Sequence, residues 1–197
     1  MASFFIFKLS QRARIYGDAA IGIVSAVGVA GGVVVASLAK GFNVDLFSYL
    51  FGSLLAVKSS EIYFLVLLVL LTLAFLIYYY RPLFALAFDE VSARAMGVKV
   101  AWLNSILLVL SALTVAVAVK AVGVMLVSAL LILPAAAALQ GAKNFRWALA
   151  SAALFALAAV WLGLLAALNF NLPAGASIVL AGFFLFLGAY IYSHFRS

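Results

Sequence analysis

Long, uninterrupted apolar runs constrain this chain more than any other feature of its sequence. A helix needs about 20 apolar residues to cross a bilayer core of about 30 Å, and several runs reach that length. Apolar residues make up 70% of the 197 residues and charged residues only 9%, against roughly 25% charged residues in ordinary soluble domains. A soluble domain of this size has too little interior to bury so much apolar surface, so the sequence predicts an integral membrane protein.

The same runs predict an all-α fold, a polytopic transmembrane helix bundle of about six spans. Strands of a membrane barrel would alternate polar and apolar residues over about ten positions, whereas these runs are apolar throughout and about twice as long. We expect the whole chain, 1–197, to form a single transmembrane domain. The expected spans are about 19–39, 61–80, 100–119, 121–139, 146–168 and 174–193.

The basic residues between the spans predict how the chain is oriented. With a cytoplasmic N-terminus, Lys40, Lys58 and Lys120 lie outside and the other nine of the 12 Lys and Arg residues lie inside. Because cytoplasmic loops carry the excess of Lys and Arg, the chain is expected to be a multi-pass protein of the cell membrane with both termini in the cytoplasm. Basic residues that flank apolar runs in this way do not indicate nucleic-acid binding.

The segment 41–60 between the first two spans is too short and too polar to cross the bilayer. Its aromatic residues predict either a helix that lies at the outer interface or a re-entrant helix that plugs the outer mouth of a pathway.

Small and helix-breaking residues indicate which spans lie inside the bundle. Small residues let helices pack closely in lipid, and the first span contains Gly22 and Ser25 while the fourth contains Ser128. Pro134 interrupts the fourth span, where it either bends the helix for packing or lines a pathway. These four residues are our candidates for lining a pathway. Metal ligands stay unknown, since the chain has no cysteine and one histidine, which excludes an ordinary His/Cys zinc site within one copy.

One charged stretch, AFDEVSARAMGV at residues 87–98, stands apart from the apolar runs. It predicts a short amphipathic helix over about 83–97, with Glu90 and Arg94 as an i,i+4 ion pair and Gly97 as the stop. Phe88, Val91, Ala95 and Val98 would share one side of it. A helix that rests on lipid headgroups usually carries many Lys or Arg residues. This one is more acidic than basic, which favours docking onto another protein.

The stretch FDEVSARAMGV resembles the D-E…A…G signature of metal-type ABC transporter permeases, the membrane subunits of zinc, manganese and iron uptake systems. The similarity runs from about residue 11 to the end of the chain. Four further stretches resemble the family in the same order: DAAIG, SYLFGSLLAVKSSE, KAVGVMLVSALLILPAAAA and LPAGASIVL.

The resemblance implies a permease subunit that imports a divalent metal ion and is not itself an enzyme. The short helix would be a coupling helix that docks into a separate cytoplasmic ATPase subunit. ATP would bind to that subunit, and this chain would bind no cofactor of its own; it has no G-x-x-x-x-G-K-[ST] loop. A second permease copy would complete a homodimer in the lipid bilayer, and an extracytoplasmic metal-binding protein would deliver the ion. The implied coupling residues are Asp89, Glu90, Ala93, Arg94 and Gly97.

The chain departs from the family in one respect, because family members usually carry further spans before the DAAIG point. We expect a truncated chain, one split over two genes or a divergent short form. Two other functions stay open at this point: a secondary transporter and a non-transporting membrane fragment. A secondary transporter would call for repeats with paired broken spans, whereas the sequence has one proline-broken span and no convincing internal repeat.

Overall fold

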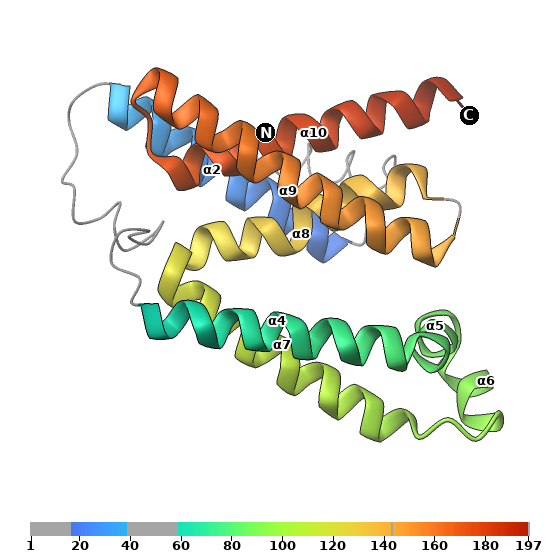
Figure 1. Ribbon diagram of the computed structural model, residues 1–197. Helices are drawn as coiled ribbons and strands as arrows, with labels where there is room; N and C mark the ends of the chain where they lie inside the picture. The colour runs from blue at the N-terminus through green and yellow to red at the C-terminus, as the bar shows by residue number, and fades with distance from the viewer. Residues whose placement is uncertain (1–16, 39–58, 143, 197) are drawn as a thin grey trace. The chain divides into compact units, whose positions relative to one another are not determined.

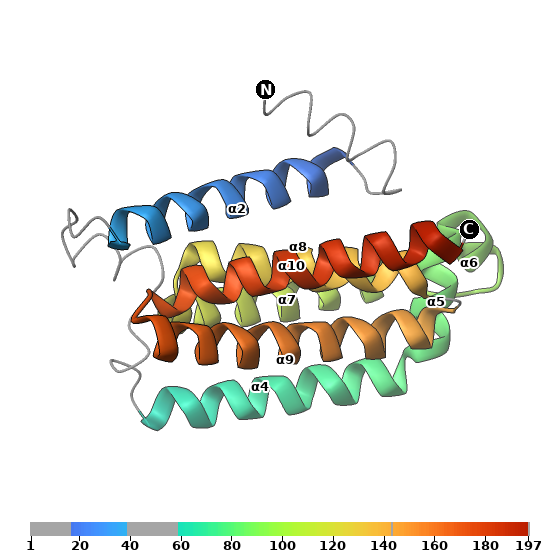
Figure 2. The same cartoon turned by 90° about the horizontal axis from the view of Figure 1, so that it is seen from above.

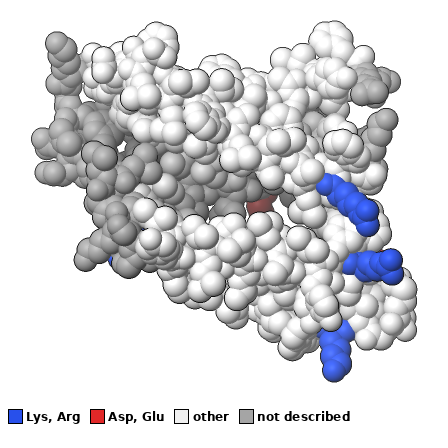
Figure 3. Space-filling model, viewed as in Figure 1, with Lys and Arg blue, Asp and Glu red and all other residues white. Residues whose placement is uncertain are grey.

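A computed structural model describes residues 17–38, 59–142 and 144–196, and all regular structure in these ranges is helical (Figure 1). The described helices fall into two compact units, one formed by the described residues within Met1–Ser53 and Val122–Ser197 and the other by those within Leu54–Ala121. Charged side chains are few on the face drawn in Figure 3, where uncharged residues cover most of the surface. Such a surface is what a chain surrounded by lipid presents.

The first unit is built around α10, which packs against each of the three other helices in that unit. α8, α9 and α10 run side by side (Figures 1 and 2), and α2 contacts α8 and α10. Ile23, Leu133, Val179 and Phe186 are the largest side chains that are fully buried in this interior. The helices are α2 (Gly17–Leu38), α8 (Val124–Gly141), α9 (Phe145–Phe170) and α10 (Ala174–Arg196).

Small residues set how closely the helices of this unit approach one another. A Cβ atom added to Gly163 of α9 would lie 2.4 Å from the Cα atom of Ile178 in α10. A Cβ atom added to Gly22 of α2 would lie 2.4 Å from the terminal Cδ1 atom of Ile132 in α8. The first contact is with backbone and the second with the end of a flexible side chain, so only the first is rigid.

The second unit contains the charged stretch. α4 and α5 are bent by 75° relative to each other, and the break falls at Tyr79, whose ring packs 5.3 Å from the Trp102 ring between centroids. Each helix contributes apolar side chains to the interior: Leu68, Leu83, Ala93, Val100, Leu103 and Leu110. The helices are α4 (Ser59–Tyr78), α5 (Tyr80–Phe88), α6 (Glu90–Ala95) and α7 (Val100–Val122).

The predicted all-α, multi-span architecture is confirmed. Among the described residues, five helices are long and apolar enough to cross a membrane, and the bent pair Ile62–Tyr78 and Tyr80–Phe88 would make a sixth span if it crosses as one. α8 continues through the buried Pro134. That the whole chain acts as a single transmembrane domain stays a prediction. Residues 41–58 of the outer segment predicted over 41–60 lie outside the described ranges.

One predicted element is wrong in its bounds. The coupling helix expected over about 83–97 is two helices, α5 and α6, which are separated by Asp89 in an extended conformation with φ −156° and ψ 106°. The physical reason is that the Asp89 carboxylate bonds to backbone N–H groups that follow it. An aspartate with this geometry begins a helix and does not continue one.

Substitution of Gly163 by Ala should destabilise the first unit by roughly 1–3 kcal/mol, because the added methyl group meets backbone atoms that cannot move aside. Gly22→Ala should cost less, since the Ile132 side chain can change rotamer. Gly31→Ala is the matched control, because no heavy atom lies within 4 Å of its added Cβ. Thermal unfolding of each variant in detergent measures the order, and a Gly163→Ala variant that melts with the control would contradict this packing.

Candidate functional site

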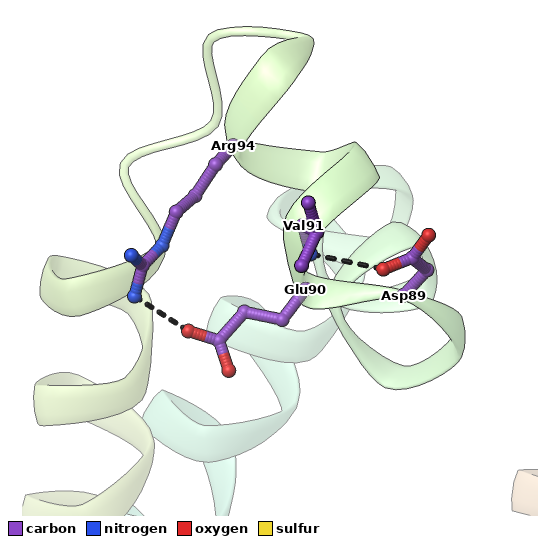
Figure 4. Close-up of polar contacts among 4 residues, drawn as sticks. All are labelled: Asp89, Glu90, Val91 and Arg94. Carbon is purple, nitrogen blue, oxygen red and sulfur yellow. Dashed lines mark hydrogen bonds and ion pairs between the residues drawn. The ribbon is translucent and has the colours of Figure 1, made fainter.

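The candidate site is α6 with the residues that flank it, and its first turn is held by Asp89. The Val91 N–H donates to Oδ1 of Asp89 at 2.9 Å, and the Ser92 hydroxyl donates to Oδ2 (Figure 4 draws the Val91 bond). Asp89 is therefore the N-cap of α6, a position at which aspartate, asparagine and serine are preferred because they accept from otherwise unpaired N–H groups.

The other end of α6 is closed by Gly97. This residue has φ +82°, a left-handed conformation that glycine adopts without steric cost. Its N–H donates to the Arg94 carbonyl at 3.0 Å, and the Val98 N–H donates to the Ala93 carbonyl at 3.1 Å. This pair of bonds is a Schellman motif, which satisfies the last carbonyls of a helix. The predicted stop at Gly97 is thus where the helix ends.

The charged side chains of α6 bind one another. Arg94 Nη2 lies 2.7 Å from Glu90 Oε1 (Figure 4), and both side chains are at least half exposed. An exposed i,i+4 pair of this kind contributes only a few tenths of a kcal/mol. The hydrogen bond from the Ser92 hydroxyl, followed by those from the Ser92 and Val91 backbone, lowers the pKa of Asp89. Both carboxylates are therefore engaged within the helix itself.

Ala93 is the residue that seats α6 in the second unit. Its side chain is fully buried, with 0% exposed, and α6 packs against α5. A larger side chain at this position would have no room without moving the helix. Sequence reasoning included Ala93 only through the family resemblance, and the helical wheel did not single it out. The break at Asp89 changes the helical phase, so a wheel drawn across it misplaces the buried side.

Apolar side chains make up much of the exposed surface beside α6. Phe88, Val91 and Met96 are 72%, 77% and 68% exposed, and we call them the apolar triad. The sequence placed Phe88 and Val91 on one apolar side of a helix but did not identify Met96. Next to Met96 lies a cavity of about 520 Å³, which is also lined by Gly97, Lys99 and Trp102. The triad and this cavity offer apolar contact to a partner.

The four pathway candidates lie in two kinds of environment. Pro134 is buried and Gly22 is half-buried against Ile132, whereas Ser25 and Ser128 are exposed. The Ser128 hydroxyl donates to the Val124 carbonyl of its own helix at 2.9 Å. Gly22 and Pro134 thus have a packing role, and a pathway role for any of the four stays a prediction.

The described residues hold no cluster that identifies a metal site. Among residues 17–38, 59–142 and 144–196 there is no group of three or more His, Asp or Glu side chains that could hold a metal ion. The metal ligands that the sequence left unknown are therefore not assigned.

Comparison with known proteins places the chain in a family. The model of the ABC 3 transport family matches residues 1–193. The manganese transport system membrane protein of Listeria innocua is 34% identical over 185 residues, covering 94% of this chain and 66% of that protein. The manganese import system permease protein of Streptococcus gordonii is 37% identical over 188 residues, covering 95% of this chain and 67% of that protein.

A zinc transporter component and a solved structure are also similar. The high-affinity zinc uptake system membrane protein of Haemophilus influenzae is 31% identical over 170 residues, covering 86% of this chain and 65% of that protein. The structure of PsaBC from Streptococcus pneumoniae in complex with Fab contains a chain that is 33% identical, with a TM-score of 0.69 over 96% of this chain and 68% of that one. This chain thus spans about two thirds of the length of its relatives.

The Asp89 cap should make α6 sensitive to acid. The folded-state pKa of Asp89 is below the ordinary value of about 3.9. The cap therefore stabilises α6 fully above that ordinary value, and its contribution is lost as the pH falls through the lowered pKa. At neutral pH, Asp89→Ala should speed hydrogen exchange of the Val91 amide, whereas Asp89→Asn should exchange nearly as slowly as the wild type and lose the acid dependence. Equal exchange in the wild type and Asp89→Ala would contradict the cap.

Proposed function

The chain belongs to the ABC 3 transport family, and from that premise we propose that it is the membrane-spanning permease subunit of an ABC transporter that imports a divalent metal ion. Manganese, zinc and iron are the candidate ions, and manganese and zinc are named for its relatives. A transport permease is not itself an enzyme. Membership in this family leaves a secondary transporter without support.

The observation that carries the proposal is α6, a short helix that is closed at both ends before any partner binds. An isolated helix of six residues would not persist in water, because nucleation costs more than so few hydrogen bonds return. Here the Asp89 cap, the Schellman motif at Gly97 and the buried Ala93 hold it in place. A rigid, exposed helix next to the membrane spans is suited to transmit the movement of a partner to those spans.

We assign the partner as a cytoplasmic ATPase subunit, which would bind and hydrolyse ATP. The proposed contact is the apolar triad and not the charged side chains. Burial of apolar surface contributes roughly 25 cal/mol per Å², whereas an exposed ion pair contributes little. Phe88, Val91 and Met96 are largely exposed, so they have the most apolar area to lose to a partner. Asp89, Glu90, Ala93, Arg94 and Gly97 would then shape and position the helix.

The remaining assembly follows the family. A second permease copy would form a homodimer around a central pathway, and an extracytoplasmic metal-binding protein would deliver the ion to it. The cytoplasmic position of both termini rests on the nine-to-three distribution of the 12 Lys and Arg residues. The metal ion would be the substrate of this protein, and its ligands are not assigned.

Substitutions in the apolar triad should show whether apolar contact or charge holds the ATPase subunit to α6. Val91→Asp and Met96→Asp should each weaken co-purification of the ATPase at least about tenfold, because a carboxylate would have to be buried without a partner. Glu90→Gln is the matched control on the same helix and should change binding less than about threefold, given the small contribution of exposed pairs. A chain without residues 87–98 that still binds the ATPase normally would overturn the assignment of the site.

Uptake of labelled manganese and zinc tests the function itself. Cells that express the chain with the ATPase and the metal-binding protein should accumulate one of these ions in an ATP-dependent manner, and Val91→Asp should abolish accumulation. The matched control is an ATPase variant that cannot hydrolyse ATP. If no divalent ion accumulates although the ATPase binds, the docking site stands and the metal-import function is wrong.

A further inference from the structure

A cavity of about 520 Å³ lies in the second unit, where the chain passes from α6 into α7. All of its lining residues fall between positions 79 and 103, so the cavity belongs to this unit alone. A water molecule takes up about 30 Å³ of liquid volume, so the cavity has room for whole side chains. Its walls include Tyr79, Pro82, Met96, Gly97, Lys99 and Trp102.

Most of the cavity wall is apolar. The Tyr79 and Trp102 rings meet edge to face, with an interplanar angle of 63°, and Pro82 and Met96 add aliphatic surface. Met96 is largely exposed and is also a member of the apolar triad. A partner that covers the triad therefore reaches the cavity as well.

Lys99 supplies the charge on this wall. Its side chain is exposed and forms no hydrogen bond or ion pair with any residue of the described ranges, whereas Arg94 on α6 is paired with Glu90. Lys99 also directly precedes α7, and the N-terminal end of a helix favours negative charge. The cavity thus joins apolar walls to a positive charge that the helix beside it does not neutralise.

A partner that covers this cavity has to provide a counter-charge. Removing an ammonium group from water without an anionic partner costs far more free energy than burial of an apolar side chain gains. A protein that buries Met96 next to Lys99 is therefore expected to bring a carboxylate to the Lys99 ammonium, where it accepts charge-assisted hydrogen bonds.

A single carboxylate of a protein suits this charge better than a lipid surface does. Segments that bind anionic lipid headgroups usually carry roughly 4–8 Lys or Arg residues. Residues 79–103 hold fewer basic residues and also contain acidic ones, which anionic headgroups would repel: Arg81, Arg94 and Lys99 against Asp89 and Glu90.

We propose that the cavity receives an acidic side chain and an apolar neighbour from the cytoplasmic ATPase subunit. The carboxylate binds the Lys99 ammonium, and the apolar side chain lies against Met96 and Trp102. The contact rests on the proposed function, because the ATPase subunit is taken as the partner of α6. It adds Lys99 and its cavity to the docking site and gives the chemistry of the segment that they accept.

Co-purification of the ATPase subunit with the full chain tests the charge. Lys99→Glu should weaken binding at least about tenfold, because like charges placed together across an interface repel each other. Lys99→Arg keeps the charge and should stay within about threefold of the wild type. Arg81→Glu makes the same charge reversal at an exposed residue that does not line the cavity, and it should also stay within about threefold because salt screens distant charges.

The same measurement separates this contact from the proposed function. If Lys99→Glu binds the ATPase subunit as well as the wild type does, the contact is wrong and the α6 site stands. If the wild type binds no ATPase subunit, both are wrong.

A larger side chain at Val98 tests whether the partner enters the cavity. Val98 lines it, so Val98→Phe should weaken binding at least about tenfold, because an overfilled site forces its neighbours apart. Val109→Phe makes the same change on α7 at a position that is 57% exposed and away from the cavity, and it should bind normally. Equal binding by both variants would contradict entry into the cavity.

Carbodiimide cross-linking identifies the counter-charge, because this reagent joins a contacting amine and carboxylate into an amide with loss of water. Mass spectrometry of the cross-linked complex should find Lys99 joined to an Asp or Glu of the ATPase subunit, and Lys99→Arg should lack this product. No link from Lys99 to the ATPase subunit, or a link to Asp18 of the same chain, would overturn the proposal. Loss of co-purifying phosphatidylglycerol from Lys99→Glu, with ATPase binding unchanged, would show that a lipid headgroup occupies the cavity instead.

Discussion

The lack of water in the hydrocarbon core of a bilayer is the constraint on which this structure depends. A backbone N–H or C=O group left unpaired in that core costs several kcal/mol, and a helix pairs these groups within one segment. Most of the described chain is accordingly built from long apolar helices. Where helices end, specific residues take over the unpaired groups: Asn144 accepts from the Trp147 N–H at the start of α9, and Asn171 adopts a left-handed conformation at its end.

The ends of the charged stretch also have to be closed, because any helix leaves unpaired backbone groups at its two ends. At α6 the chain leaves the pattern of long spans, and a helix of six residues cannot rely on its own length. The Asp89 carboxylate, bonded to the Ser92 hydroxyl and the Val91 N–H, closes one end and Gly97 closes the other, and the buried Ala93 fixes the helix to the unit. The acidic composition of this stretch favours docking onto another protein. The geometry assigns those charges to the helix itself and leaves apolar side chains exposed.

Sequence patterns predicted the spans well because hydrophobic length is a local property. The expected spans at 100–119 and 174–193 correspond to membrane-length helices at Val100–Val122 and Ala174–Ser193. The break at Asp89 was missed because helical periodicity was read across it. Asp89 followed directly by Glu90 was the available signal, since Asp is a preferred N-cap and acidic residues are enriched in the first turn of a helix. A pathway, in contrast, depends on how helices and copies are arranged, so Ser25 and Ser128 could not be tested by local pattern.

Contact between apolar side chains contributes differently to binding in the bilayer core and in water. Within lipid, contact between apolar side chains gains nothing from leaving water, so helices associate through close van der Waals packing; Gly163 against Ile178 is such a contact. In water the hydrophobic effect acts in full, and the proposed orientation puts α6 in the aqueous cytoplasm. An exposed Val91 or Met96 there has a driving force for binding that an exposed Leu on α4 lacks. The few exposed apolar residues beside α6 therefore carry more information about partners than the many on the spans.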